Sequence, residues 1–143
     1  MEADGIFVYG PLRTGGSEHA WLDRTGPEGC CRAWIAGRLF HVPMGNFPAL
    51  IAGQEPGAPP PGPGWVAGEF FGYEDEATLE AALADLDQLK NVEGGLYVRR
   101  VLPILLDSGG RYGAWVYLFE SDRLLQLERQ AMELPSGDWS AYL

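Results

Sequence analysis

Gly5-Ile6-Phe7-Val8-Tyr9-Gly10-Pro11-Leu12-Arg13 is the first apolar stretch of the chain, and its pattern predicts a strand followed by a turn. The apolar, β-branched and aromatic residues over 5–9 indicate a buried strand, which Gly10-Pro11 ends. A strand that stops at such a turn can aim backbone N–H groups at a small anion or a carbonyl oxygen. Arg13 could then hold a carboxylate through two parallel hydrogen bonds. An ordinary strand-ending turn with a solvated arginine fits the same residues, so both interpretations stand at this point.

The rest of the chain alternates short strands with a few helices. Runs of apolar and aromatic residues predict strands over residues 30–42, 47–51, 65–73, 96–107 and 112–119. Leucines at helical spacing predict a main helix over 75–89 capped by Asp75, and shorter helices are expected over 17–22, with Trp21 on the inner side, and 123–132. Residues 53–64 are rich in proline and glycine and predict an exposed surface loop. We therefore expect a single α+β domain over residues 1–143, built around a curved sheet or small barrel.

The overall charge excludes two classes of partner. The chain has 143 residues, 46% of them hydrophobic, and a formal net charge of −10. Nucleic acids and anionic membrane surfaces attract clustered Lys and Arg, which this acidic chain lacks. No apolar run reaches the ~20 residues of a membrane span, and the N-terminus shows no signal-peptide pattern. We expect a cytoplasmic protein that is a monomer or a weak homodimer and acts on a small molecule.

The residues that most often carry metal or nucleophilic chemistry give little signal. Cys30 and Cys31 are adjacent and have no third cysteine to pair with, so we expect two small buried hydrophobic residues in a reducing compartment. His19 and His41 lack partners at ligand spacing, so neither a metal nor a cofactor is expected. Nucleophile-elbow and P-loop motifs are absent. Glu69 interrupts an apolar strand. We expect its side chain on the solvent-facing side of that strand, and a carboxylate that lines a cavity is the alternative.

Lys90 is the only lysine of the chain and follows the main helix. A cation at this position is favoured by the negative end of the helix dipole. Gly94-Gly95 are expected to end the helix and let the next strand begin. Glu93 is the one acid of this connection and could face either solvent or a cavity.

Taken together, these residues resemble the gamma-glutamylcyclotransferase-like superfamily, and most closely its bacterial YtfP-type branch. Residues 6–13 are similar to the family's opening FVYGTLR. Further blocks follow in the family's order along nearly the whole chain, at residues 37–40 with 46–50, 66–71, 83–87 with 96–99, and 114–117. The resemblance implies a small mixed α/β barrel with a central cavity and one main helix packed on the sheet.

The resemblance also implies a reaction. The α-amine of a γ-glutamyl amine or amide attacks its own γ-carbonyl, which releases the amine and forms 5-oxoproline. The family holds the glutamyl group with a Tyr-Gly-x-Leu loop, which maps to Tyr9, Gly10, Pro11 and Leu12. We expect Arg13 and Tyr97, which lie in matching blocks, to join these residues in binding substrate.

Two positions depart from the family pattern. Lys90 occupies the position of the family's catalytic glutamate, and Pro11 that of its usual threonine or serine. A second alignment places Glu93 at the catalytic position. With Glu93 or a neutral Lys90 as base, the chain is predicted to be an enzyme of this type. A charged Lys90 instead predicts an inactive family member that binds a carboxylate-bearing metabolite, and a third interpretation makes the proline-rich residues 56–63 a ligand for a protein groove.

Overall fold

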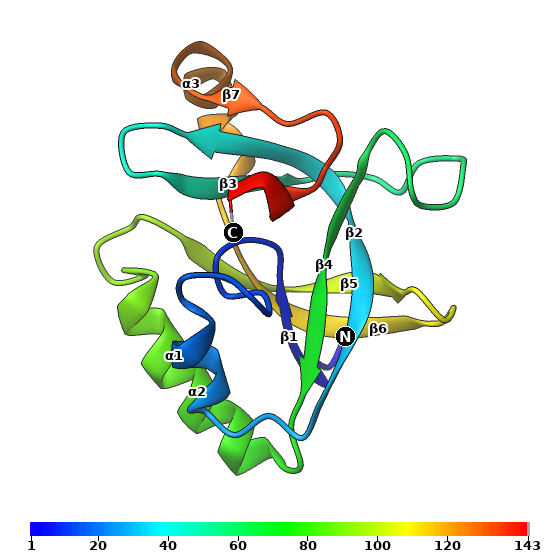
Figure 1. Ribbon diagram of the computed structural model, residues 1–143, viewed down its shortest axis with the longest axis vertical. Helices are drawn as coiled ribbons and strands as arrows, with labels where there is room; N and C mark the ends of the chain where they lie inside the picture. The colour runs from blue at the N-terminus through cyan, green and yellow to red at the C-terminus, as the bar shows by residue number, and fades with distance from the viewer. Residues whose placement is uncertain (143) are drawn as a thin grey trace.

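In the computed structural model, which describes residues 1–142, the central sheet closes on itself to form a barrel (Figure 1). The barrel strands pair in the order β2 (Gly29–Val42), β4 (Trp65–Gly72), β1 (Gly5–Val8), β6 (Arg111–Leu118) and β5 (Val98–Leu106). Closure occurs where β5 pairs with β2, at Ala33↔Leu106 and Trp34↔Leu105. The β1–β6 pair is parallel and the others are antiparallel. The expected α+β barrel is therefore confirmed.

Strand β2 is long because it serves two sheets in succession. Its first part pairs with β4, and from Gly37 onward it pairs with β3 (Phe47–Ala52). The short strand β7 (Met132–Glu133) pairs with the same end of β2. A Cβ atom on Gly37 would lie 2.5 Å from the backbone oxygen of Ile51, so glycine is required where the strand changes partners.

Strand β1 passes between two apolar regions. Phe7 points into the barrel interior with Tyr9, whereas Ile6 and Val8 pack toward the helices. This alternation is the period of two expected of a strand. Because Phe7 is fully buried, its truncation to alanine is expected to cost about 3–5 kcal/mol of stability.

Helix α2 (Glu76–Leu89) is the main helix and runs along one side of the barrel (Figure 1). It begins at Asp75, whose side chain accepts a hydrogen bond from the backbone N–H of Thr78 at 2.7 Å. Its buried face consists of Leu79, Ala82, Leu83 and Leu86. The shorter helices are α1 (His19–Asp23) and α3 (Leu124–Gln130), with 3-10 turns η1 (Ser121–Arg123) and η2 (Trp139–Tyr142).

Helix α2 ends at Leu89, as the leucine spacing predicts, but the residue that terminates it differs from the expectation. The helix stops before Gly94-Gly95, because Asn91 takes the left-handed conformation with φ of 50°. The backbone N–H of Val92 donates to the carbonyl of Asp87, and that of Asn91 to the carbonyl of Gln88, each at 3.1 Å. This is the Schellman pattern with asparagine in the position that glycine usually takes. It leaves Lys90 as the C-terminal cap.

Two further expectations are wrong. Cys30 and Cys31 are exposed, because β5 reaches β2 only at Ala33 and leaves the start of β2 without a neighbour on that side. Trp21 is 49% exposed, whereas Leu22 is the buried residue of α1.

Residues 53–64 connect β3 to β4 and contain neither helix nor strand. Trp65 at the end of this connection donates its indole N–H to the carbonyl of Ala58 at 2.9 Å. Among the described helices, none has the length and apolar character needed to cross a bilayer.

Candidate functional site

The turn that follows β1 forms the first wall of the candidate site. The backbone N–H of Arg13 donates to the carbonyl of Gly10 at 3.0 Å, which closes a β-turn with Pro11 at its second position. Within the described residues, no acceptor is assigned to the backbone N–H of Leu12. A side chain at Gly10 would collide with the ring of Pro48, so only glycine allows the turn to lie against β3.

Two carboxylates, those of Asp138 and Glu69, hold this turn in place. Arg13 donates to Asp138 at 2.8 Å. Thr14 donates from its backbone N–H and its hydroxyl to Glu69, at 2.6 and 3.0 Å. Burial acts to raise the pKa of Asp138, but the hydrogen bonds from Arg13 and from the backbone of Ser140 outweigh burial and leave that pKa below its usual value. Arg13 thus pairs with a carboxylate of the protein itself, and Glu69 binds the turn.

A small cavity lies behind the turn, between β1, β3 and the end of α2. Its volume is about 20 Å³, and it is lined by Phe7, Val8, Tyr9, Gly10, Pro11, Leu12, Pro48, Lys90, Tyr97 and Tyr117. A water needs about 10–15 Å³ on this measure, so the space suits one water. The cavity therefore has to widen before it can admit a metabolite.

Two of the phenol groups that line the cavity donate to backbone carbonyls. Tyr9 donates to the carbonyl of Tyr117 at 2.5 Å, and Tyr97 donates to the carbonyl of Pro48. Burial raises the pKa of Tyr9. Burial, with Tyr9 and Glu18 nearby, also holds the pKa of Tyr97 well above its usual range. These residues are neutral walls of the cavity at ordinary pH.

Lys90 is the only charged residue among the described residues that line the cavity. It is buried, with 7% of its surface exposed. Its Nζ lies 3.0 Å from a carboxylate oxygen of Glu18 and 5.3 Å from the centre of the Tyr97 ring. The backbone N–H of Glu18 donates to the carbonyl of Pro11 at 3.0 Å, which places this carboxylate beside the turn.

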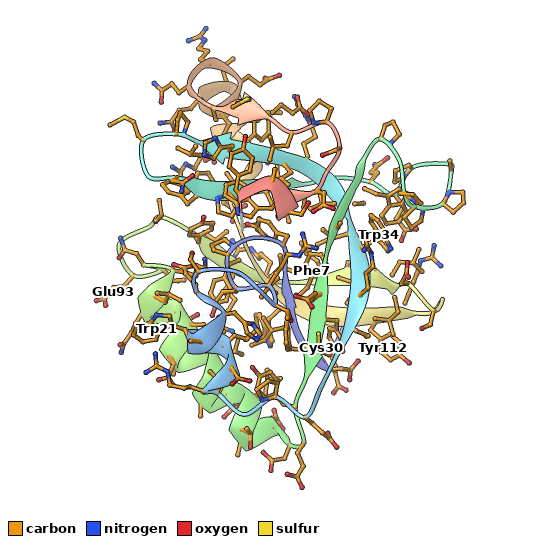
Figure 2. All side chains as sticks on the ribbon, in the orientation of Figure 1. Phe7, Trp21, Cys30, Trp34, Glu93 and Tyr112 are labelled. Atoms are coloured by element: carbon orange, nitrogen blue, oxygen red, sulfur yellow. The ribbon has the colours of Figure 1, made fainter. Side chains whose placement is uncertain are left out.

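Glu93 lies apart from the cavity. It is exposed in the turn that follows α2, and Figure 2 shows its side chain pointing away from the barrel. The structure therefore brings Tyr9, Gly10, Pro11, Leu12, Tyr97 and Lys90 together around one cavity and leaves Glu93 and Arg13 outside its lining.

Asp87 fixes the end of α2 against the barrel. Its carboxylate accepts two hydrogen bonds from Arg99, at 2.8 and 3.1 Å, and one from the hydroxyl of Tyr117 at 2.7 Å. Lys90 follows three positions later, so this bidentate pair also sets the place of the lysine.

Several residues of the site escape sequence reasoning. Glu18 reaches Lys90 across 72 positions in the chain, and Asp138 reaches Arg13 across 125. No spacing pattern signals contacts of this range. Pro48 and Tyr117 lie in segments that resemble the family, but the resemblance assigned them no role.

The described residues offer this site backbone donors and one buried ammonium. They contain no group of three or more His, Cys, Asp or Glu side chains able to hold a metal ion. A cation at the wall of an apolar cavity, next to a turn with a free N–H, can recognise a carboxylate or stabilise negative charge on an oxygen.

Comparison with known proteins gives a consistent result. The family model described as gamma-glutamyl cyclotransferase, AIG2-like, matches residues 6–141. No curated protein matched the chain.

Among solved structures, YkqA from Bacillus subtilis is similar, with 22% identity and a TM-score of 0.65 over 99% of this chain. The chain spans 41% of the length of that protein. An AIG2-like protein from Mus musculus shows 21% identity and a TM-score of 0.57, over 82% of this chain and 78% of that one. A structure named gamma-glutamyl cyclotransferase shows 19% identity and a TM-score of 0.55, over 82% and 67%. At these identities the likeness concerns the fold.

Proposed function

This chain belongs to the gamma-glutamyl cyclotransferase, AIG2-like family, and we propose that its cavity binds a small metabolite that carries a carboxylate, with γ-glutamyl compounds as the first class to test. The observation that carries this proposal is the buried ammonium of Lys90 at the cavity wall. In the resembled family a glutamate occupies this position. Here the charge of the wall is reversed, and a positive wall favours an anionic ligand.

The surroundings of Lys90 support an anion as its partner. A buried charge is costly unless it is paired and hydrogen-bonded. Glu18 takes one of the three donors of the ammonium. A ligand carboxylate would take another, and the neighbouring N–H of Leu12 would donate to an oxygen of the same ligand. The apolar rings of Phe7, Tyr9 and Tyr97 suit the methylene chain of a glutamyl group.

Titration calorimetry with γ-glutamylethylamide tests this proposal, using wild type, Lys90→Met and Asp23→Asn. Methionine keeps most of the length of the side chain and removes its charge. A charge-assisted hydrogen bond contributes about 1.5–3 kcal/mol, so the dissociation constant should rise by about 10- to 100-fold in Lys90→Met. Asp23 is exposed on α1, and its variant is the matched control that should bind as wild type does. Equal affinity of all three proteins, or no binding by any, would contradict the proposal.

A second candidate is turnover of the same ligand, and the position of Glu18 favours it. Cyclisation forms a bond between the α-nitrogen and the γ-carbonyl carbon and breaks the bond from that carbon to the leaving nitrogen. One proton moves from the attacking nitrogen to the leaving amine, so a carboxylate that carries it is required. Glu18 brings a carboxylate to Lys90, which in this chain occupies the position of the family's glutamate.

The turnover candidate predicts release of 5-oxoproline from γ-glutamylethylamide, followed by mass spectrometry. Glu18→Gln should abolish the release, and Glu93→Gln, which changes an exposed carboxylate outside the cavity, should not alter it. Loss of turnover in Glu93→Gln alone would assign the base to Glu93. Binding without any turnover would leave the chain a metabolite binder.

A further inference from the structure

A groove lies between α2 and the outer face of strands β5 and β6, and none of its described lining residues also lines the cavity behind the first turn. Its volume is about 900 Å³. Along α2 the lining extends from Asp75 to Asp87, which corresponds to about 18 Å of helix. A groove of this length matches about three turns of a second helix.

The floor of this groove is apolar. Leu79 and Leu83 form its helix side, and Val101 with Trp115 form its strand side. Val101 and Trp115 are cross-strand partners, and they face away from the barrel because the residue that follows each of them packs into the barrel interior. Both are half-buried, so an apolar strip of the sheet beside α2 stays open to solvent.

The rim of the groove carries unpaired negative charge. Several carboxylates elsewhere on the surface pair with arginines, as Glu55 does with Arg111 and Glu120 with Arg100. In the part of the chain that the structure describes, five exposed carboxylates of the rim have no such partner: Glu2, Asp4, Glu74, Glu76 and Glu80. The last two lie four positions apart on α2, where like charges repel and destabilise a helix.

The groove has little positive charge of its own. Arg99 is the one basic side chain in its described lining, and it already pairs with Asp87 at 2.8 Å. The same guanidinium lies 4.3 Å from the centre of the Trp115 ring. The only lysine of the chain, Lys90, is buried at the cavity wall. A cation that neutralises the rim therefore has to come from another molecule.

We propose that this acidic groove docks a basic amphipathic helix of a partner protein. Apolar side chains on one face of such a helix would cover Val101 and Trp115, and lysines or arginines on its flanks would pair with the carboxylates of the rim. The rim alone would attract any cation, and the floor adds the requirement for an apolar face. Negative charge at the rim repels nucleic acids and anionic membranes. This inference goes beyond the proposed function and is independent of it.

The probe is a fluorescein-labelled peptide of about three helical turns, with leucines at helical spacing on one face and lysines at the other positions. Fluorescence anisotropy measures its affinity for wild type and for the groove variant, Glu76→Gln with Glu80→Gln. The matched control is Glu93→Gln with Asp122→Asn, which changes two exposed carboxylates outside the groove. A second peptide of the same composition in scrambled order keeps the charge and loses the apolar face. Thermal unfolding of each variant confirms that it is folded.

The groove variant should bind the probe about 5- to 30-fold more weakly than wild type, as the loss of two exposed ion pairs would give, and the control should stay within about twofold. The scrambled peptide should bind wild type at least about tenfold more weakly than the probe. In spectra of ¹⁵N-labelled protein, the probe should shift the amide resonances of Leu79, Glu80, Val101 and Trp115. Equal weakening in both double variants, or equal affinity of the two peptides, overturns the proposal, because net charge alone would then explain the binding.

Two other occupants are distinguished with the same proteins. Spermine that displaces the probe and binds wild type at least as tightly as the probe does would make the groove a polyamine site. A dimer of wild type in sedimentation velocity that the groove variant loses would make the groove a contact between two copies of this chain. Either result overturns the docking of a basic helix.

Discussion

Lys90 keeps a charged group inside the protein because three features of its surroundings replace water. Glu18 provides the counter-charge, the face of the Tyr97 ring attracts the cation, and the C-terminus of α2 contributes a negative dipole end. Each is available only to a cation at this position. A carboxylate introduced there would meet Glu18 and the dipole as repulsive neighbours.

The first prediction is a charge exchange between these two residues. Lys90→Glu should destabilise the protein, whereas Glu18→Lys combined with Lys90→Glu should recover part of the loss because an ion pair is restored. Contacting charged residues couple by about 0.5–3 kcal/mol. Urea unfolding of wild type, both single variants and the double variant measures this coupling free energy. Strict additivity of the two single effects would show that the pair contributes nothing.

The second prediction concerns Cys30, an exposed residue whose thiol we expect to react slowly. The sulfur itself is partly shielded from solvent, and this desolvation, together with its hydrogen bond to Glu69 at 3.4 Å, raises the pKa of Cys30 to about 12. Glu69→Gln removes the negative charge, so the pKa should fall and alkylation at mildly alkaline pH should accelerate. The rates are compared in a Cys31→Ser background, where only one thiol remains. An unchanged alkylation rate would show that Glu69 does not affect the reactivity of the Cys30 thiol.

At the scale of elements, the turn after β1 depends on a distant tail. Arg13 reaches Asp138, which precedes η2, so the tail and the turn are fixed together. Because Arg13 and the Ser140 backbone lower the pKa of Asp138, the carboxylate binds its proton less readily in the folded state than in the unfolded state. Its contribution to stability is present above the unfolded pKa and is lost as the pH falls through the folded pKa.

The third prediction follows from the loss of this stabilising contribution at low pH. Asp138→Asn should lower the free energy of unfolding at pH 7, and the difference from wild type should shrink as the pH falls below the ordinary aspartate value of 3.8. Urea unfolding over a pH series measures it. A difference that is constant with pH would mean that the charge of Asp138 does not contribute.

The elements of this fold could be predicted because their signals are local. The period of two in β1 and the leucine spacing of α2 involve residues that are close in the sequence. The N-cap of α2, Asp75, is likewise predicted from its neighbours. The end of α2 at Leu89 was predicted, but the residue that terminates it was not, because Asn91 rather than a glycine adopts the left-handed conformation. The exposure of Cys30 and Cys31 depends on where β5 pairs with β2. No local sequence pattern predicts that position.

The candidate site was predicted in part for the same reason. Tyr9, Gly10, Pro11 and Leu12 are contiguous, and the resemblance drew attention to Lys90. Which of Lys90 and Glu93 lines the cavity depended on the turn geometry after α2. The partner of Lys90 depended on a contact between the start of α1 and the end of α2 that only the folded chain creates.

At the scale of the whole molecule, buried tyrosines make the stability of the protein depend on pH in the alkaline range. Burial raises the pKa of Tyr9, Tyr73, Tyr97 and Tyr117 above the ordinary value of 10.0. The unfolded chain ionises at about 10, so it binds fewer protons than the folded protein above that pH. The stabilising contribution is therefore complete below pH 10 and is lost as the pH rises beyond it.

The fourth prediction tests this with Tyr9→Phe, which removes one of these hydroxyls. Above pH 10, each buried phenol should reduce the free energy of unfolding by about 1.4 kcal/mol per pH unit. The variant should show a smaller slope than wild type in urea unfolding between neutral and alkaline pH. Identical slopes would show that Tyr9 ionises in the folded protein as it does in the unfolded chain.

The binding of a carboxylate-bearing metabolite at the cavity behind the first turn is tested most directly by amide NMR. Uniformly ¹⁵N-labelled protein is titrated with γ-glutamylethylamide, and the backbone resonances are followed. We predict that the largest shifts occur at Gly10, Leu12, Lys90 and Tyr97, and that they disappear in Lys90→Met. Saturable shifts that map to other surfaces, or the absence of any shift at these residues, would contradict the assignment of this cavity as the binding site.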